Sequence, residues 1–335
     1  MTGPSFHILF EFREGPYGGA NQFLKALRDA LARAGRYAEE PARADVVLFN
    51  SHHDLKAVMA ARRTFPDKPF IHRVDGPMRL YNGPSDKRDA LVIRANNALA
   101  DATVFQSAWS LQENRRLGWV ASGPETVIGN APDPSIFNLE RPVSPMSGDK
   151  IRLIATSWSD NPNKGFDAYE HLDSTLDFLR FEMVFIGNTP IRFGNIRHLP
   201  PMPSAELAKK LKESDVFIAG SRHDPCSNSL IEALHCGLPA VARNGGGYPE
   251  ILGLGGELFE TPEEIPPLVE RIGGDYTAYL SRIVIPDISE IAAAYLDFAR
   301  TLLDGQGAGR LTPKRLGTLR ALAFRLRERY AAAFH

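Results

Sequence analysis

Residues 221–239 read SRHDPCSNSLIEALHCGLP and are the part of the sequence that says most about the fold. They follow the apolar run 216–219, begin as a polar loop, continue as a short helix and stop at Gly237 and Pro239, two residue types that end helices. A strand followed by a loop and a helix is the repeating unit of parallel α/β sheets.

The same unit recurs on both sides of this stretch. Short runs rich in Val, Ile and Phe alternate with segments of helical periodicity, a pattern typical of βαβ units. We expect strands in the first half at 7–12, 46–49, 69–74, 102–106 and 126–128. In the second half they are expected at 151–155, 181–186, 196–199, 216–219, 240–242 and 257–259.

Two doubly wound α/β domains are therefore predicted. The segment 139–150 carries prolines, serines and a glycine without periodicity and is interpreted as the linker. The domains are expected at 1–145 and 146–285, with a ligand cleft between them because parallel sheets bind ligands at the carboxyl ends of their strands. A helix at 286–304, a candidate to return to the N-terminal domain, precedes a basic tail at 306–335.

Composition excludes several classes of protein. With 335 residues, 43% hydrophobic and 24% charged, the chain is neither disordered nor collagen-like. Its two cysteines lack zinc-ligand spacing, so we expect no metal and a reducing, cytoplasmic location. Neither an 18-residue apolar run nor a signal peptide is visible. The motifs G-x-G-x-x-G, G-x-x-x-x-G-K-[ST], H-E-x-x-H and G-x-S-x-G are missing, which disfavours dehydrogenases, P-loop NTPases, zinc proteases and α/β-hydrolases.

The net charge of −1 divides into −7 for residues 1–305 and +6 for the tail, so no nucleic acid is expected as partner of the body. On a helix, the tail would carry one apolar stripe bordered by arginines: Leu316, Leu319, Leu322, Leu326, Tyr330 and Phe334. Two interpretations stay open. Residues 310–335 bind an anionic membrane surface, giving a peripheral location on its inner face, or the stripe packs on the body or on another subunit.

The loop and helix at 221–239 have the chemistry of an anion and sugar site. Free N–H groups at a helix N-terminus favour a phosphate or diphosphate. Asp224 and Glu232 supply carboxylates that accept hydrogen bonds from sugar and ribose hydroxyls. The structural alternative is equally open at this point, since Ser229 and Glu232 fit a capping box and Asp224-Pro225 an ordinary turn.

The run DPCSNSLIEALHCGLPAVA resembles the E-x(7)-E signature of the family 4 retaining glycosyltransferases, which have the GT-B fold. The resemblance covers about residues 6–304 and includes four further segments in the family's order: Gly18-Gly19, His72-Arg73-Val74-Asp75-Gly76, Val127–Asp133 and Asn163-Lys164-Gly165. It implies a GT-B architecture of two Rossmann-like domains, an N-terminal one for the acceptor and a C-terminal one for the donor.

The resemblance also implies roles for single residues. Glu232 would bind the ribose of a nucleoside diphosphate sugar, and Asp224 with the backbone of Cys226 and Ser227 would hold the hexose. Asn228 N–H and Lys164 would contact the diphosphate, which the backbone at Gly18 and Gly19 would approach closely. His72 or Asp75 would lie near the transferring sugar. These residues also have structural alternatives. Gly18 and Gly19 would form a flexible turn, Lys164 would be solvated, His72 would be a core residue and the cysteines would be small buried thiols.

The sequence departs from the family pattern at three places. Asp224 replaces the first Glu, and Cys226-Ser227-Asn228 replaces the aromatic-Gly-Leu that usually follows. Ser157-Trp158-Ser159 occupies the region where an arginine is expected before Lys164. A lysine lacks the bidentate fork of an arginine, so the helix N-terminus or another cation would carry more of the diphosphate binding.

The sequence thus predicts a metal-independent retaining transferase that needs no cofactor. It would move a hexose from a nucleoside diphosphate sugar to a hydroxyl of a glycan or lipid-linked glycan, by front-face attack as the resemblance implies. Two alternatives stay open. One is an inactive nucleotide-sugar-binding homologue, and the other is a glycoside hydrolase with Asp224 and Glu232 as its carboxylate pair.

Overall fold

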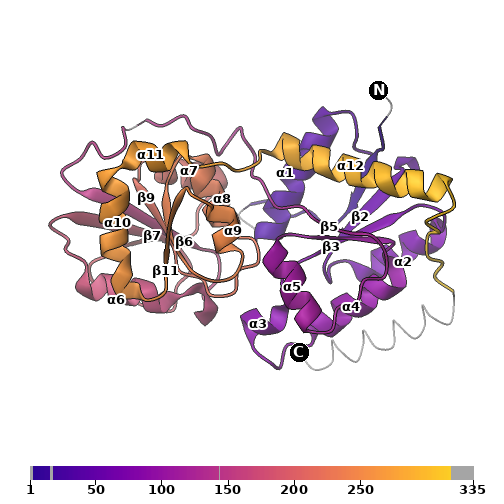
Figure 1. Ribbon diagram of the computed structural model, residues 1–335, viewed down its shortest axis with the longest axis horizontal. Helices are drawn as coiled ribbons and strands as arrows, with labels where there is room; N and C mark the ends of the chain where they lie inside the picture. Colours follow the sequence, from indigo (N-terminus) through magenta and orange to yellow (C-terminus); the bar gives the residue numbers. More distant parts are fainter. Residues whose placement is uncertain (1–2, 16–17, 143, 318–335) are drawn as a thin grey trace. The chain divides into compact units, whose positions relative to one another are not determined.

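The computed structural model describes residues 3–15, 18–142 and 144–317, which divide into two units, each built on one parallel sheet (Figure 1). Of the described residues, the first unit comprises 3–12, 24–129 and 289–317, and the second comprises 13–15, 18–23, 130–142 and 144–288. The units meet in the chain at Gly129 and Asn130 rather than at 145, because part of the expected linker packs on the second unit. Phe137 lies in its core, and Arg141 donates a hydrogen bond to the Gly237 carbonyl (2.9 Å).

The first sheet has the order β1-β2-β3-β4-β5. Its strands are β1 (Phe6–Leu9), β2 (Val46–Asn50), β3 (Phe70–Val74), β4 (Ala102–Phe105) and β5 (Glu125–Val127). Its helices are α1 (Gly19–Arg33), which begins in the second unit, α2 (Leu55–Thr64), α3 (Met78–Asn82), α4 (Arg88–Leu99), α5 (Ala108–Arg116) and α12 (Ile288–Gly307).

A single parallel bridge makes this sheet doubly wound. Tyr37 pairs with Phe6 on the outer side of β1, so the chain first runs outward from β1 and then returns across it to β2. Because such crossovers are right-handed, the two directions place helices on opposite faces. Leu9 accordingly packs in the cluster of α2 and α4, whereas the Phe6 ring contacts the Tyr295 ring of α12.

The second sheet has the order β11-β10-β9-β6-β7-β8. Its strands are β6 (Ile151–Ser157), β7 (Phe181–Gly187), β8 (Arg197–Leu199), β9 (Val216–Ala219), β10 (Ala240–Arg243) and β11 (Gly256–Phe259). Strand order reverses between β6 and β9, so the loops after these two strands flank the position where doubly wound sheets bind ligands.

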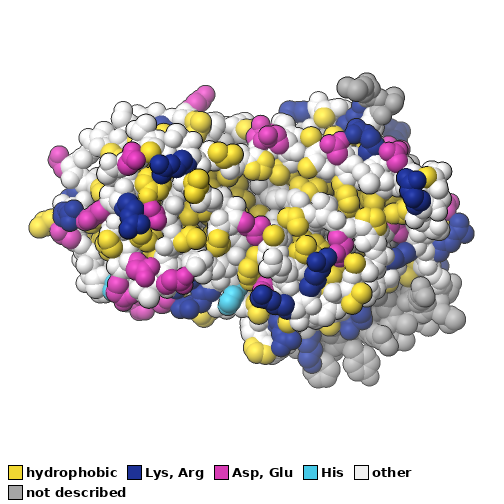
Figure 2. Space-filling model, in the orientation of Figure 1, with side chains coloured by type: hydrophobic (Ala, Val, Ile, Leu, Met, Phe, Trp, Pro, Cys, Tyr) yellow, Lys and Arg dark blue, Asp and Glu magenta, His cyan; other side chains and the backbone are white. Residues whose placement is uncertain are grey.

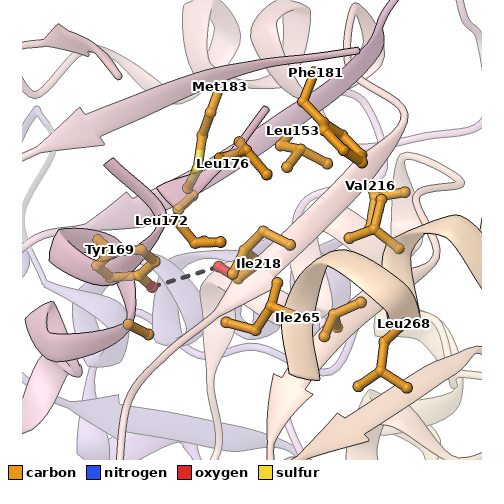
Figure 3. Packing of buried hydrophobic residues seen from close by; sticks show 14 of the residues in the cluster. Leu153, Tyr169, Leu172, Leu176, Phe181, Met183, Val216, Ile218, Ile265 and Leu268 are labelled. Carbon is orange, nitrogen blue, oxygen red and sulfur yellow. Dashed lines mark hydrogen bonds between the residues drawn. The ribbon is translucent and has the colours of Figure 1, made fainter. Parts of the chain in front are cut away.

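Helices cover both faces of the second sheet. They are α6 (Phe166–Thr175), α7 (Ser204–Lys212), α8 (Asn228–His235), α9 (Tyr248–Leu252), α10 (Ile265–Gly274) and α11 (Tyr276–Ser281). Alternate strand residues point to opposite faces: Leu153 and Ile218 pack with α6 and α10 (Figure 3), whereas Ile154 and Phe217 pack with α7 and α8. Three short 3₁₀ turns complete the chain: Pro41–Arg43, Pro162–Lys164 and Pro262–Glu264.

The beginning of the basic tail is part of the first unit. Residues 311–317 are not helical, and Leu316 is only 8% exposed within the α2 and α4 cluster. The Lys314 backbone N–H donates to the Asp101 carboxylate (2.6 Å). The expectation that Leu316 belongs to a helix is therefore wrong, and of the two interpretations left open for the stripe, this side chain follows the one in which it packs on the body. The rest of the stripe lies outside the described residues.

Candidate functional site

Two loops meet at the reversal point of the second sheet. Gly165, with φ +77°, allows this approach: a Cβ there would lie 1.8 Å from the Gly220 carbonyl oxygen. A side chain at this position would push the loop after β6 away from the loop after β9. The close approach brings Lys164 beside Asp224. The distance between Lys164 Nζ and Asp224 Oδ2 is 3.1 Å.

The N-terminus of α8 lies in the second of these loops. Ser227 caps the helix by accepting a hydrogen bond from the Leu230 N–H (3.3 Å). Among the described residues, no partner is recorded for the N–H groups of Asn228 and Ser229. Two free N–H groups and the positive end of the helix dipole thus lie in the loop that carries the Lys164–Asp224 pair, an arrangement that suits an anion.

Asn228 is fixed from two sides. Asn130 Nδ2 donates to its Oδ1 (2.8 Å), and a Cβ on Gly19 would lie 2.3 Å from its Nδ2. Gly19, the first residue of α1, is therefore in direct contact with the Asn228 amide, whereas nothing lies within 4 Å of a Cβ on Gly18. The two glycines expected to act together have different surroundings, and only Gly19 is held by a close approach.

Glu232 lies one turn further into α8 and is partly buried. Its carboxyl group has no recorded hydrogen bond or ion pair with any described residue. Burial without a compensating cation raises its pKa to about 8. A ligand that supplies hydrogen-bond donors would therefore favour the carboxylate form of this group.

The loop after β10, which was not predicted as part of the site, also contacts it. Gly246, with φ +60°, packs its backbone against Asp224, and the Gly247 N–H donates to the Asp224 carbonyl (2.8 Å). Tyr248, the first residue of α9, is buried, and this burial raises its pKa to about 12. The run Gly245-Gly246-Gly247 directly after a strand is the sequence signal that would have indicated this contact.

Arg243 does not replace the missing arginine at the site. Its guanidinium donates to the Gly220 carbonyl and to Asp167 (both 2.8 Å) and lies over the Phe259 ring. Arg222 pairs with the same Asp167 carboxylate (2.8 Å). Arg222 and Arg243 therefore stabilise the loop after β9 through Asp167 and do not point to the anion site as free cations. Cys226 and Cys236 are buried free thiols, and the Cys226 N–H donates to Asp224 Oδ1 (3.3 Å).

His72 and Asp75, expected near the transferring sugar, belong to the first unit. His72 is 0% exposed and stacked on Phe49, with ring centroids 4.3 Å apart. Its Nε2 lies 2.9 Å from the Ser51 carbonyl and its Nδ1 lies 3.2 Å from Asn96 Nδ2. Burial lowers its pKa to about 4. The expected catalytic role of His72 is therefore corrected to a structural one, because the ring is enclosed and both nitrogens are occupied.

Asp75 stands at the carboxyl end of β3 with its side chain 17% exposed. Its Oδ1 accepts hydrogen bonds from Arg73 Nη1 (3.1 Å) and from Gln106 Nε2. It is thus the expected catalytic residue of the first unit that can reach a ligand.

Within residues 3–15, 18–142 and 144–317, no group of three or more His, Cys, Asp or Glu side chains is arranged to hold a metal ion. In the same part of the chain, no helix is both long and apolar enough to cross a membrane. Figure 2 shows acidic and basic side chains interspersed over the visible surface.

Comparison with known proteins identifies a family over part of the chain. Residues 194–272, which contain the loop of Asp224 and the whole of α8, match the model of the family "Glycosyl transferases group 1".

Solved structures resemble the whole chain at low identity. Sucrose-phosphate synthase from Thermosynechococcus elongatus has a TM-score of 0.63 at 15% identity, covering 92% of this chain and 98% of that one. HepE from Anabaena in complex with UDP has a TM-score of 0.63 at 16% identity, covering 91% of this chain and 100% of that one. The catalytic domain of starch synthase IV from Arabidopsis thaliana, bound to ADP and acarbose, has a TM-score of 0.68 at 12% identity. The match covers 90% of this chain and 99% of that one. At these identities the likeness concerns the fold, and the expected GT-B fold class is confirmed.

Proposed function

We propose that this chain, a glycosyltransferase of the group 1 type by the match of residues 194–272 and by its fold, transfers a hexose-type sugar from a nucleoside diphosphate sugar to a hydroxyl group with retention of anomeric configuration. The observation that carries the proposal is the cluster at the reversal point of the second sheet. There a cation, two N–H groups and a carboxyl group stand on two adjacent loops and one helix, and the N–H groups and the carboxyl group have no partner within the described part of the chain.

The diphosphate would bind at the N-terminus of α8. Lys164 Nζ supplies a positive charge, and the N–H groups of Asn228 and Ser229 supply hydrogen-bond donors. In the absence of donor, Asp224 neutralises Lys164, so the diphosphate would compete with this carboxylate for the ammonium group. Solved structures of proteins with this fold hold UDP, UDP-glucose and ADP, which supports a nucleoside diphosphate as the anion.

The ribose would bind to Glu232. Two vicinal hydroxyls can both donate to one carboxylate, and Glu232 has no competing partner among the described residues. Asp224, once Lys164 turns to the phosphates, would accept hydrogen bonds from hexose hydroxyls together with the backbone of Cys226 and Ser227.

The chemical step breaks the bond between the anomeric carbon and the diphosphate oxygen while the acceptor oxygen attacks. Negative charge develops on the departing diphosphate, where Lys164 and the α8 N–H groups would stabilise it without a metal ion. One such preorganised donor contributes about 2.7–4 kcal/mol to a transition state in other enzymes. In front-face attack, the leaving phosphate oxygen takes the proton of the acceptor hydroxyl. We extend the proposal to a glycan or lipid-linked glycan as acceptor.

Donor hydrolysis tests the proposal without knowledge of the acceptor. The protein is incubated with UDP-, ADP- and GDP-sugars, and the anomer of the released sugar is followed by ¹H NMR before mutarotation. We expect one donor to release sugar of unchanged anomeric configuration, and Lys164→Met to slow release at least about 100-fold. Lys210→Met, a change to a lysine paired with Glu213 on α7, is the control. Inverted sugar would contradict retention, and nucleotide binding without any turnover would support the inactive homologue.

A further inference from the structure

Asn228, the first residue of α8, carries a side-chain amide where the family pattern has a leucine. Helical side chains tilt toward the N-terminus of their helix, so the side chain of the first residue lies in front of the first turn. The N–H groups of Asn228 and Ser229 face the same region. A leucine can only pack there, whereas an amide adds a hydrogen-bond donor group and an acceptor.

The two ends of the Asn228 amide have different surroundings. Its Oδ1 accepts a hydrogen bond from Asn130 Nδ2 (2.8 Å). For its Nδ2, no hydrogen-bond partner is recorded among the described residues, and the Asn228 side chain is partly exposed. The acceptor end is thus satisfied by the protein, and the donor end is left for a ligand or for water.

The groups that surround Asn228 Nδ2 are donors as well. Gly19, the first residue of α1, is in contact with this nitrogen, since a Cβ there would lie 2.3 Å from it. At the starts of α1 and α8, no partner among the described residues is recorded for the N–H groups of Gly19, Ala20, Asn228 and Ser229. An amide placed for stability alone would turn its oxygen to such N–H groups. Asn130 holds the oxygen instead, so the described residues offer donors here without an acceptor.

Asn130 is well placed to fix this orientation. It is the first residue of the second unit and only 5% exposed. Burial of an amide costs free energy unless its polar atoms are hydrogen bonded, so exchange of this contact for another is unfavourable. Because the oxygen and the nitrogen of an amide point in different directions, the bond to Oδ1 directs Asn228 Nδ2 away from Asn130.

We propose that Asn228 Nδ2 donates a hydrogen bond to a phosphate oxygen of the nucleoside diphosphate, and that Asn130 is a positioning residue that holds the amide for this contact. The proposal rests on the proposed function for the ligand and goes beyond it, because the resemblance assigns only the backbone N–H of Asn228 to the diphosphate. An anionic acceptor suits a group of donors at the positive end of a helix dipole. The amide would supply part of the binding that the missing arginine before Lys164 does not provide.

Calorimetric titration of UDP, ADP and GDP into two variants of Asn228 tests the donor. Asn228→Leu removes the amide and should weaken binding of the preferred nucleotide by about tenfold. Asn228→Asp keeps an acceptor for Asn130 Nδ2 but places a negative charge where the donor was, so binding should be weaker by about 100-fold. Asn195→Leu, the same change at an exposed amide that donates to the Asp173 carbonyl, is the matched control and should bind as the wild type does.

The order of these two variants separates binding from a purely structural role. An acidic residue in the first turn stabilises a helix, and Asn228→Asp also keeps the contact with Asn130. If the amide served stability alone, Asn228→Asp would therefore bind the nucleotide better than Asn228→Leu. We expect the reverse.

A double-mutant cycle tests the positioning role of Asn130. Asn130→Leu should weaken nucleotide binding about fivefold in the wild type, because the amide of Asn228 loses its fixed orientation. In the Asn228→Leu background the same change should have little effect, since there is no amide left to hold. Equal losses in both backgrounds would show that Asn130 does not act through Asn228 and would overturn its positioning role.

The remaining outcomes separate this proposal from the proposed function. Unchanged nucleotide affinity in folded Asn228→Leu, with weaker binding in Lys164→Met, would overturn the contact of the amide and leave the diphosphate site in place. A loss confined to the sugar nucleotide, with normal binding of UDP, ADP or GDP, would assign the amide to the hexose and also overturn the proposal. Folded wild type that binds no nucleotide would contradict the proposed function, and this proposal with it.

Discussion

Nucleotide binding should release a proton from Glu232. With a pKa of about 8 in the free protein, this carboxyl group is about 80% protonated at pH 7.4. Ribose hydroxyls donate hydrogen bonds and so favour the carboxylate, which moves the pKa toward its ordinary value of 4.5. Binding at pH 7.4 is therefore expected to release about 0.8 proton.

The sign of the pH dependence follows from the same shift. Below pH 8 the site must first lose a proton, so affinity should rise by up to about tenfold per pH unit and level off above pH 8. Calorimetric titrations in buffers of different ionisation enthalpy measure the released protons directly. Glu232→Gln cannot ionise and is the reference, because the titration of the diphosphate itself is common to both proteins. Equal proton release in wild type and Glu232→Gln would refute the assignment of the ribose to this residue.

Two further substitutions test close packing, each against a matched control. Gly19→Ala should weaken nucleotide binding, because its Cβ would lie 2.3 Å from the Asn228 amide. In Gly18→Ala the added Cβ meets no atom within 4 Å, so this variant should bind the nucleotide as the wild type does. Equal nucleotide affinities of the two variants would contradict the contact of Gly19 with Asn228. Leu316→Ala should lower the unfolding free energy by about 2–3 kcal/mol, because the Leu316 side chain is buried. Leu179→Ala, at an 84% exposed position, is the control and should change it by less than about 0.5 kcal/mol. Denaturant titrations measure both values.

The architecture could be predicted from the sequence because the pattern of apolar residues indicates which segments are buried. Strands such as β3 and β9 are buried along their whole length, and their apolar runs identified them within a residue or two. The bridge at Tyr37 could not be predicted. It consists of one residue pair held by two backbone hydrogen bonds, which leave no side-chain pattern.

The candidate site was predictable where a local motif carries it. Lys164, Asp224 and Asn228 were named from their motifs, and the structure brings Lys164 and Asp224 together on two loops. The contact of Gly19 with Asn228 depends on segments 200 residues apart in the sequence, so spacing says nothing about it. His72 was expected to meet the sugar, but its neighbours on β2 and α4 enclose it, and a sequence motif does not report enclosure.

Titration of UDP and ADP into wild type, Lys164→Met and Lys210→Met tests whether a diphosphate binds beside Lys164. We expect micromolar binding of one nucleotide to wild type and to Lys210→Met. Binding to Lys164→Met should be weaker by about 30-fold, since a hydrogen bond to a charged group contributes about 1.5–3 kcal/mol. Equal binding in all three proteins, or no binding by folded wild type, would contradict a diphosphate site at the N-terminus of α8.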